Sequence, residues 1–340
     1  QAPATNAPPP DPYVLLAGFD FGQDRAPLNQ IDEAIKAATG DAARRAEIEG
    51  KLAGLLSQPS LPVGAQNYIC LTLSVIGSEK SVPALAGLLG DARTADLARL
   101  ALERIPHPAA GAALRTALPK SAGRTRIGLV QSLGVRRDEA AVPLLAPLLK
   151  ESDPATVSAA AHALGLIGGE RATTALLTTG RLDVPAIADA AMRCADQLPA
   201  QGAKAAAAIY RTVMTNAPAH VGEAALVGLA RVAPDEAGAR LLSLFDSGDE
   251  AAVARAIPLA PRVQVPTLHR AAPDRLPNLP VGAQVGHAGR ACGPVVRSGR
   301  MAAATLWRMR WDDDMEPAVA LAREAAADGE VPVGAVVLAA

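Results

Sequence analysis

The sequence has few aromatic residues, few cysteines and no long apolar run, and each shortage excludes a class of protein. Phenylalanine, tyrosine and tryptophan make up 2% of the 340 residues, although half of the residues are apolar. A core of small side chains, chiefly alanine and leucine, favours closely packed helices, and both residues are strong helix formers. No run in the sequence reaches the roughly 18–20 apolar residues that a membrane-spanning helix requires.

The charge balance and the cysteine content argue against two further classes, nucleic-acid-binding proteins and disulfide-stabilised proteins. The 33 lysines and arginines are balanced by 34 aspartates and glutamates, whereas nucleic-acid binding requires a net basic surface. The three cysteines, Cys70, Cys194 and Cys292, are odd in number and widely spaced, which is not the pattern of a disulfide framework. Because Cys70 and Cys194 lie on apolar helix faces, we expect them to be buried as small hydrophobic residues.

One octapeptide occurs a second time in nearly the same form. VPALAGLL at 82–89 returns as VPLLAPLL at 142–149, two periods of about 30 residues later. Helix breakers follow the same period, near positions 77, 106, 134, 168, 199 and 233. A unit of this length is too small to bury its own apolar face, so neighbouring units must stack. The period therefore predicts an all-α solenoid.

Helical spacing of apolar residues predicts the individual pairs. They are 28–39 with 42–57, 63–76 with 79–89, 92–105 with 108–118, 122–134 with 138–149, 154–167 with 170–179, 184–198 with 200–215, and 218–232 with 235–246, then a last helix from Asp249. We expect Asp153 to cap a helix that Pro154 begins. We also expect glycines to end first helices in left-handed turns, and Pro147 to kink its helix.

Two stretches carry a family resemblance. AVPLLAPLL follows SLGVRRDEA, and ATVSAAAHALGLIGGERATTAL contains an A-L-G-x-[IL]-G phrase. This pattern resembles HEAT repeats, particularly the short phycobilisome-lyase type, over about 60–260. The resemblance implies a right-handed α-solenoid of HEAT-like helix pairs. It is specific for the architecture and says little about function.

The chain divides into four parts by composition. Residues 1–27 are predicted to be a disordered or irregular lead, and 28–260 the solenoid. Residues 261–312 are rich in proline, glycine and arginine and lack a period, which indicates either a disordered linker or a shifted reading frame. Residues 313–340 are predicted to form a helix and a strand.

The last part resembles a second family. MEPAVALAREAAADGEVPVGAVVL at 315–338 is similar to the start of a tRNA adenosine deaminase of the cytidine-deaminase-like family. Such zinc enzymes use an H-x-E segment and a later P-C-x-x-C. Neither occurs in this sequence, so no residue receives a catalytic role and no zinc or other cofactor is expected. The match indicates the truncated start of a neighbouring deaminase gene, or else a relic or a chance similarity.

The expected function is that of a non-catalytic scaffold that binds a protein partner on its concave surface. The alternative is a deaminase fragment fused to the repeats. Ser158 and His162 lie four residues apart on one helix face without a third group, so we interpret them as surface residues. We predict neither a catalytic nor a metal site. The Pro- and Ala-rich N-terminus favours an exported, periplasmic protein and leaves a cytoplasmic one open.

One surface stands out as a candidate binding site. Residues 93–137 are locally basic. A basic ridge there would meet phosphate or an acidic partner, or its side chains would bond helix-end carbonyls within the array. The residues of this predicted ridge are Arg115, Arg124, Arg126, Arg136 and Arg137.

Overall fold

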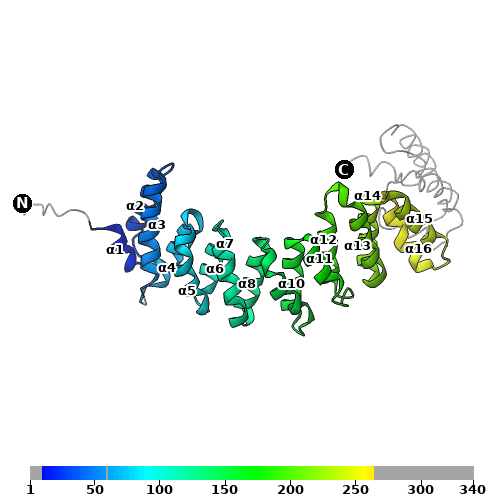
Figure 1. Cartoon of the computed structure of the whole chain (residues 1–340), viewed down its shortest axis with the longest axis horizontal. Helices are drawn as coiled ribbons and strands as arrows, with labels where there is room; N and C mark the ends of the chain where they lie inside the picture. Colours follow the sequence, from blue (N-terminus) through cyan, green and yellow to red (C-terminus); the bar gives the residue numbers. More distant parts are fainter. Residues whose placement is uncertain (1–9, 59, 264–340) are drawn as a thin grey trace, which may run out of the picture. The chain divides into compact units, whose positions relative to one another are not determined.

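The computed structural model describes residues 10–58 and 60–263 (Figure 1). The chain divides into two compact units after Cys194. The predicted linker after residue 263 and the predicted deaminase-like tail lie outside the described residues. The α-helices of the first unit are α1 (Pro12–Ala17), α2 (Ala26–Ala37), α3 (Ala42–Leu56), α4 (Val63–Ile76), α5 (Val82–Gly87), α6 (Ala95–Arg104), α7 (Pro108–Ala117), α8 (Gly123–Val135), α9 (Val142–Leu145), α10 (Pro154–Ile167), α11 (Gly169–Leu177) and α12 (Pro185–Asp196), whose end passes into the second unit.

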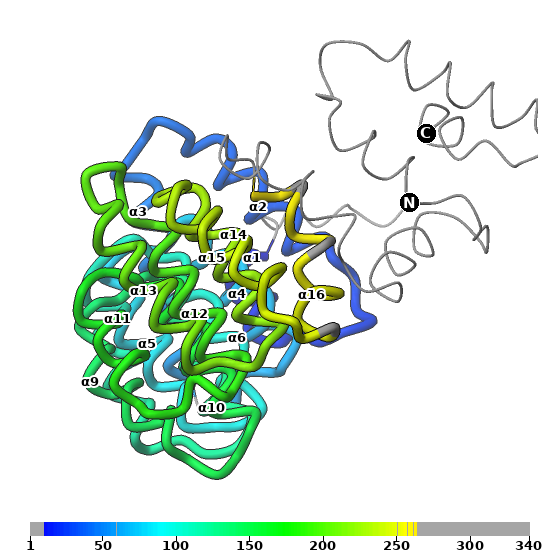
Figure 2. Tube along the Cα trace, turned by 90° about the vertical axis from the view of Figure 1, so that its right-hand side faces the viewer, coloured from blue at the N-terminus to red at the C-terminus, as the bar shows by residue number. Residues whose placement is uncertain are grey.

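The helices of the first unit stack in two layers. Helices α4, α6, α8 and α10 contact one another in order and form the first-helix layer. Helices α5 and α7, and likewise α9 and α11, lie side by side in the second-helix layer, which faces away from the first (Figure 2). The predicted all-α solenoid of helix pairs is therefore confirmed.

A repeated leucine forms the core of the first-helix layer. Leu73, Leu102, Leu133 and Leu164 occupy equivalent places in successive first helices and are completely buried. Each such side chain contributes about 1.5–3 kcal/mol of hydrophobic free energy when it is buried. The period seen in the sequence is thus the spacing at which one leucine packs against the next.

Helix ends follow the prediction in part. Asp153 accepts hydrogen bonds from the backbone N–H groups of Ala155 and Thr156, and Pro154 begins α10. Gly168 ends α10 with φ +67°, which confirms the left-handed stop there. The expectation is wrong at Gly77, whose φ of −66° belongs to extended backbone.

Gly134 is not a helix stop, which corrects another predicted break. Helix α8 continues through it to Val135, and a Cβ at Gly134 would lie 2.6 Å from the Cα of Ala163 on α10. The next first helix repeats this arrangement, because a Cβ at Gly165 would lie 3.0 Å from the Cα of Ala190 on α12. These glycines are required where two helices touch, not where one ends.

Proline shapes the second-helix layer. Helix α9 ends at Leu145, and the chain continues as a 3₁₀ segment, Ala146–Lys150, in which Pro147 removes a backbone donor. The predicted interruption at Pro147 is confirmed. Helix α5 also gives way to a 3₁₀ turn, Leu88–Gly90, although no proline is present there. Short, interrupted helices are therefore characteristic of this layer.

The N-terminal lead is more ordered than predicted. Asp11 caps α1 by accepting a hydrogen bond from the Tyr13 N–H at 2.9 Å, and Pro12 takes the first helical position. Leu16 and Phe19 are buried. The prediction of a disordered or irregular lead through residue 27 is therefore wrong at 12–17 and holds for 18–25, which form turns and irregular backbone. A cap and apolar anchors suffice to order the short helix α1 against α2 and α3.

The second unit comprises α13 (Ala203–Asn216), α14 (Ala219–Val232), α15 (Pro234–Phe245) and α16 (Glu250–Ala256), followed by a 3₁₀ segment, Ile257–Arg262. Tyr210 packs on Gly228, where a Cβ would lie 2.3 Å from its ring, and its hydroxyl donates to Asp196 at 2.6 Å. Burial and this hydrogen bond raise the pKa of Tyr210 to about 12. No helix in the described ranges is long and apolar enough to cross a membrane.

Candidate partner-binding surface

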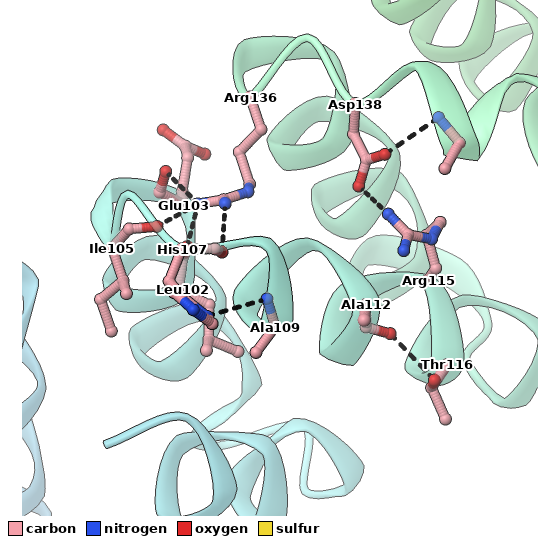
Figure 3. A network of polar contacts seen from close by, with 11 residues as sticks. Leu102, Glu103, Ile105, His107, Ala109, Ala112, Arg115, Thr116, Arg136 and Asp138 are labelled. Atoms are coloured by element: carbon pink, nitrogen blue, oxygen red, sulfur yellow. Dashed lines mark hydrogen bonds and ion pairs between the residues drawn. The ribbon is translucent and has the colours of Figure 1, made fainter. Parts of the chain in front are cut away.

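Arg136 of the predicted basic ridge faces the interior of the stack. Its guanidinium donates to the backbone carbonyls of Leu102, Glu103, Ile105 and His107 at 2.6–3.0 Å (Figure 3). These carbonyls lie at and just beyond the end of α6, where helical partners are lacking. Partial burial lowers the pKa of the guanidinium. Arg136 is therefore a C-terminal cap supplied by the next repeat.

Arg115 and Arg126 are also engaged within the array. Arg115 forms a close ion pair with Asp138, which in turn accepts a hydrogen bond from the Ala140 N–H (Figure 3). Arg126 bonds both carboxylate oxygens of Glu151, at 3.0 and 2.7 Å. Each partner lies roughly one repeat along the chain, so these arginines tie neighbouring units together.

The remaining two arginines stay at the surface. Arg124 is 93% exposed and lies 3.6 Å from Asp96, and Arg137 is exposed with φ +50°. The prediction of one open basic ridge is therefore corrected, because three of its five guanidiniums are occupied by groups of the stack. The alternative, that arginines bond helix-end carbonyls, holds for Arg136.

Two similar ties have no counterpart among the predicted site residues. Arg181 donates to the carbonyls of Leu149 and Glu151 at 2.9 and 3.1 Å. Glu49 is buried on α3 and accepts hydrogen bonds from the Ser78 N–H and from the hydroxyls of Ser78 and Ser81. The sequence contained one signal for these ties, because the two residues that each tie joins are separated by about one repeat period.

The other residues that the sequence singled out are either exposed on a helix or buried in the core. Ser158 and His162 are both exposed on α10. Cys70 and Cys194 are buried as predicted, and burial raises the pKa of the Cys70 thiol to about 12. Within the described part of the chain, no three His, Cys, Asp or Glu side chains are grouped so that they could hold a metal ion. Cys292 lies outside that part.

The outer face of the second helices has a different character. We define the second-helix face as the exposed, uncharged residues of α5, α7, α9 and its 3₁₀ continuation: Pro83, Gly87, Pro108, Ala112, Thr116, Pro143, Leu144 and Pro147. A shallow groove runs between α9 and α11 beside it. Val142, Pro143 and Ala146 line one wall, and Glu170, Arg171 and Thr174 line the other. This surface offers small apolar contacts with one acidic and one basic group at the edge.

Residues 108–193, from the start of α7 into α12, match the family model of HEAT repeats. The helix pairs are HEAT-like. The matched range covers less than half of the chain and includes the groove between α9 and α11. Helices α4, α5 and α6 precede the matched range. No curated protein matches the sequence.

Proposed function

We propose that the chain is a non-catalytic scaffold that binds a protein partner, and that the second-helix face and its groove form the concave binding surface. The groove between α9 and α11 carries the proposal, because it is the hollow that two adjacent HEAT-like repeats leave between their second helices. Stacked repeats characteristically offer such surfaces to other proteins.

The side chains favour a polypeptide over a nucleic acid. Small residues such as Gly87, Ala112 and Ala146 let a partner's main chain approach closely. Glu170 and Arg171 can each receive a side chain of opposite charge at the rim. By contrast, the guanidiniums that a phosphate backbone requires are occupied at Arg115, Arg126 and Arg136.

A binding experiment with matched variants tests the proposal. The full chain is immobilised, and bound proteins from a lysate of the source cells are quantified against Leu144→Glu and Val135→Glu. Both residues are exposed and apolar, but Leu144 lies on the second-helix face and Val135 on α8. We expect Leu144→Glu to lose a specific partner that Val135→Glu retains. A partner retained equally by both variants, or no enriched protein, contradicts the proposal.

Three more specific predictions from the sequence concern the variety of HEAT repeat, export from the cell and the deaminase-like segment. The phycobilisome-lyase variety of HEAT repeat is a resemblance in sequence alone, and export is supported only by the composition of the N-terminal residues. The alternative, a deaminase fragment fused to the repeats, rests on the resemblance of 315–338, which lies outside the described residues. Bound zinc and conversion of adenosine to inosine by the full chain would favour that alternative, and their absence removes it.

A further inference from the structure

The two halves of helix α4 meet the solvent differently. Over its N-terminal half lies the turn that contains Asp20 and Phe21, and a Cβ at Gly64 would come within 2.8 Å of the Asp20 Cα and the Phe21 N. The Asp20 carboxylate accepts a hydrogen bond from the Gly64 N–H at 2.9 Å, which fixes the turn on the helix. The Phe21 side chain nevertheless remains 65% exposed. This half of α4 therefore carries a raised aromatic side chain.

The C-terminal half of α4 is bare and apolar. Leu71 and Val75 lie four residues apart on one face and are 58% and 71% exposed. Leu100 occupies the place equivalent to Leu71 on the neighbouring helix α6 and is 44% exposed. Helix α4 has no charged residue along its whole length. Solvent-facing helix surfaces normally carry charges, and clustered exposed apolar side chains mark a contact site.

We propose that this face of α4 binds a second copy of the chain. Two copies related by a two-fold axis near the middle of α4 pair these helices antiparallel. The raised Phe21 of each copy then covers the bare Leu71 and Val75 of the other. The row Val63, Asn67, Leu71 and Val75 follows the i, i+4 spacing. Reversing the helix brings Val63 opposite Val75 and Asn67 opposite Leu71.

Self-complementarity is the reason for choosing a second copy as the occupant. A two-fold interface brings the same patch of both subunits together, so the patch must fit itself. This one contains the exposed Phe21 side chain over the N-terminal half of α4, and the exposed Leu71 and Val75 that would receive it on the C-terminal half. Helix α4 contributes no charged side chain to the patch, so no like charges of the two α4 helices meet when they pair.

This proposal is independent of the proposed partner binding. The α4 face belongs to the first-helix layer, whereas the groove lies between second helices. Either surface can therefore fail its test while the other passes.

Sedimentation velocity of the full chain over a hundredfold concentration range tests the association. We expect a dimer at high concentration whose dissociation constant rises more than about tenfold in Leu71→Asp, because the carboxylate loses water on contact with the second copy. Val135→Asp, also exposed and apolar but outside the α4 face, keeps the dimer. Circular dichroism confirms that both variants fold. A monomer throughout, or a dimer unaffected by Leu71→Asp, overturns the proposal.

Disulfide cross-linking tests the antiparallel geometry. Phe21→Cys and Val75→Cys are made separately in a Cys292→Ser background and then mixed under mild oxidation. A disulfide requires Cα atoms within about 7 Å, so we expect the mixture to give a cross-linked dimer and each variant alone to give little. Replacing Val75→Cys by Val135→Cys in the mixture should abolish the product. Equal cross-linking by the single variants, or none in the mixture, overturns the arrangement.

Discussion

The two layers of the first unit are built from the same repeat yet differ in how they pack. First helices such as α8 and α10 are long and touch closely, with Gly134 against Ala163. Second helices such as α5 and α9 are short and give way to 3₁₀ turns. Gly87 at the end of α5 has open space around its Cα, whereas Gly134 has none. One layer therefore fixes the spacing of the array, and the other presents a surface.

The polar ties follow the same division. The end of α6 depends on Arg136 from the following repeat, and Arg126 reaches Glu151 one repeat on. The exposed residues of α5, α7 and α9 are all uncharged, and an exposed charge follows only at Lys150, where the 3₁₀ continuation of α9 ends. Charged side chains such as Arg126 and Arg136 thus connect neighbouring repeats.

The largest expected effect comes from filling the contact between α8 and α10. Gly134→Val places a branched side chain where even a Cβ meets the backbone of Ala163. We expect a loss of about 3 kcal/mol in the free energy of unfolding. Urea denaturation followed by circular dichroism measures this.

Gly87→Ala is the matched control in the other layer. Its Cβ meets nothing within 4 Å and its φ is −59°, so the alanine fits a helical conformation. The variant should be more stable by about 0.5–1 kcal/mol. Equal destabilisation by both substitutions would show that the layers do not differ in packing.

Removing the guanidinium at position 136 is expected to have the next largest effect. Arg136→Ala leaves four backbone carbonyls around the end of α6 without their donor, and we expect a loss of about 2 kcal/mol in the free energy of unfolding. Arg124→Ala, at a side chain that is 93% exposed, should leave the unfolding midpoint unchanged. If the two variants have the same free energy of unfolding, Arg136 contributes no more to stability than a surface arginine does.

A smaller, pH-dependent effect is expected at the start of α10. Hydrogen bonds from the Thr156 hydroxyl and N–H lower the pKa of Asp153. A carboxylate whose pKa is lower in the folded state stabilises the fold above its unfolded pKa, and this stabilisation disappears as the pH falls through the folded pKa. The Tm of Asp153→Ala should therefore lie below that of the natural chain at neutral pH and converge with it in acid. A constant difference across pH would contradict this role.

Local structure was largely predictable because it depends on local sequence. Apolar spacing placed the helix pairs, and Asp153 with Pro154 marked the start of α10 correctly. Gly134 was misassigned because the reason for a glycine there is Ala163, one repeat away, and a helix stop looks identical in sequence. The lead was misjudged because a single cap and Leu16 order α1 only against α2 and α3.

The candidate surface was less predictable for the same reason. A basic stretch indicates charge but not its partners, and the partners of Arg115, Arg126 and Arg136 lie in neighbouring repeats. The second-helix face and the α4 face are defined by exposure, which follows from how the repeats stack. The helical period alone does not determine which of two apolar residues, such as Leu71 and Leu73, is covered.

Site-specific photocrosslinking tests the division of the surface most directly. A photoreactive phenylalanine analogue is placed at Leu144 in one version of the chain and at Leu71 in another, and both are irradiated in a lysate of the source cells. We predict that position 71 cross-links to a second copy of the chain and position 144 to a different protein. The same product from both positions, or exchange of the two products, would contradict the assignment of separate functions to the two layers.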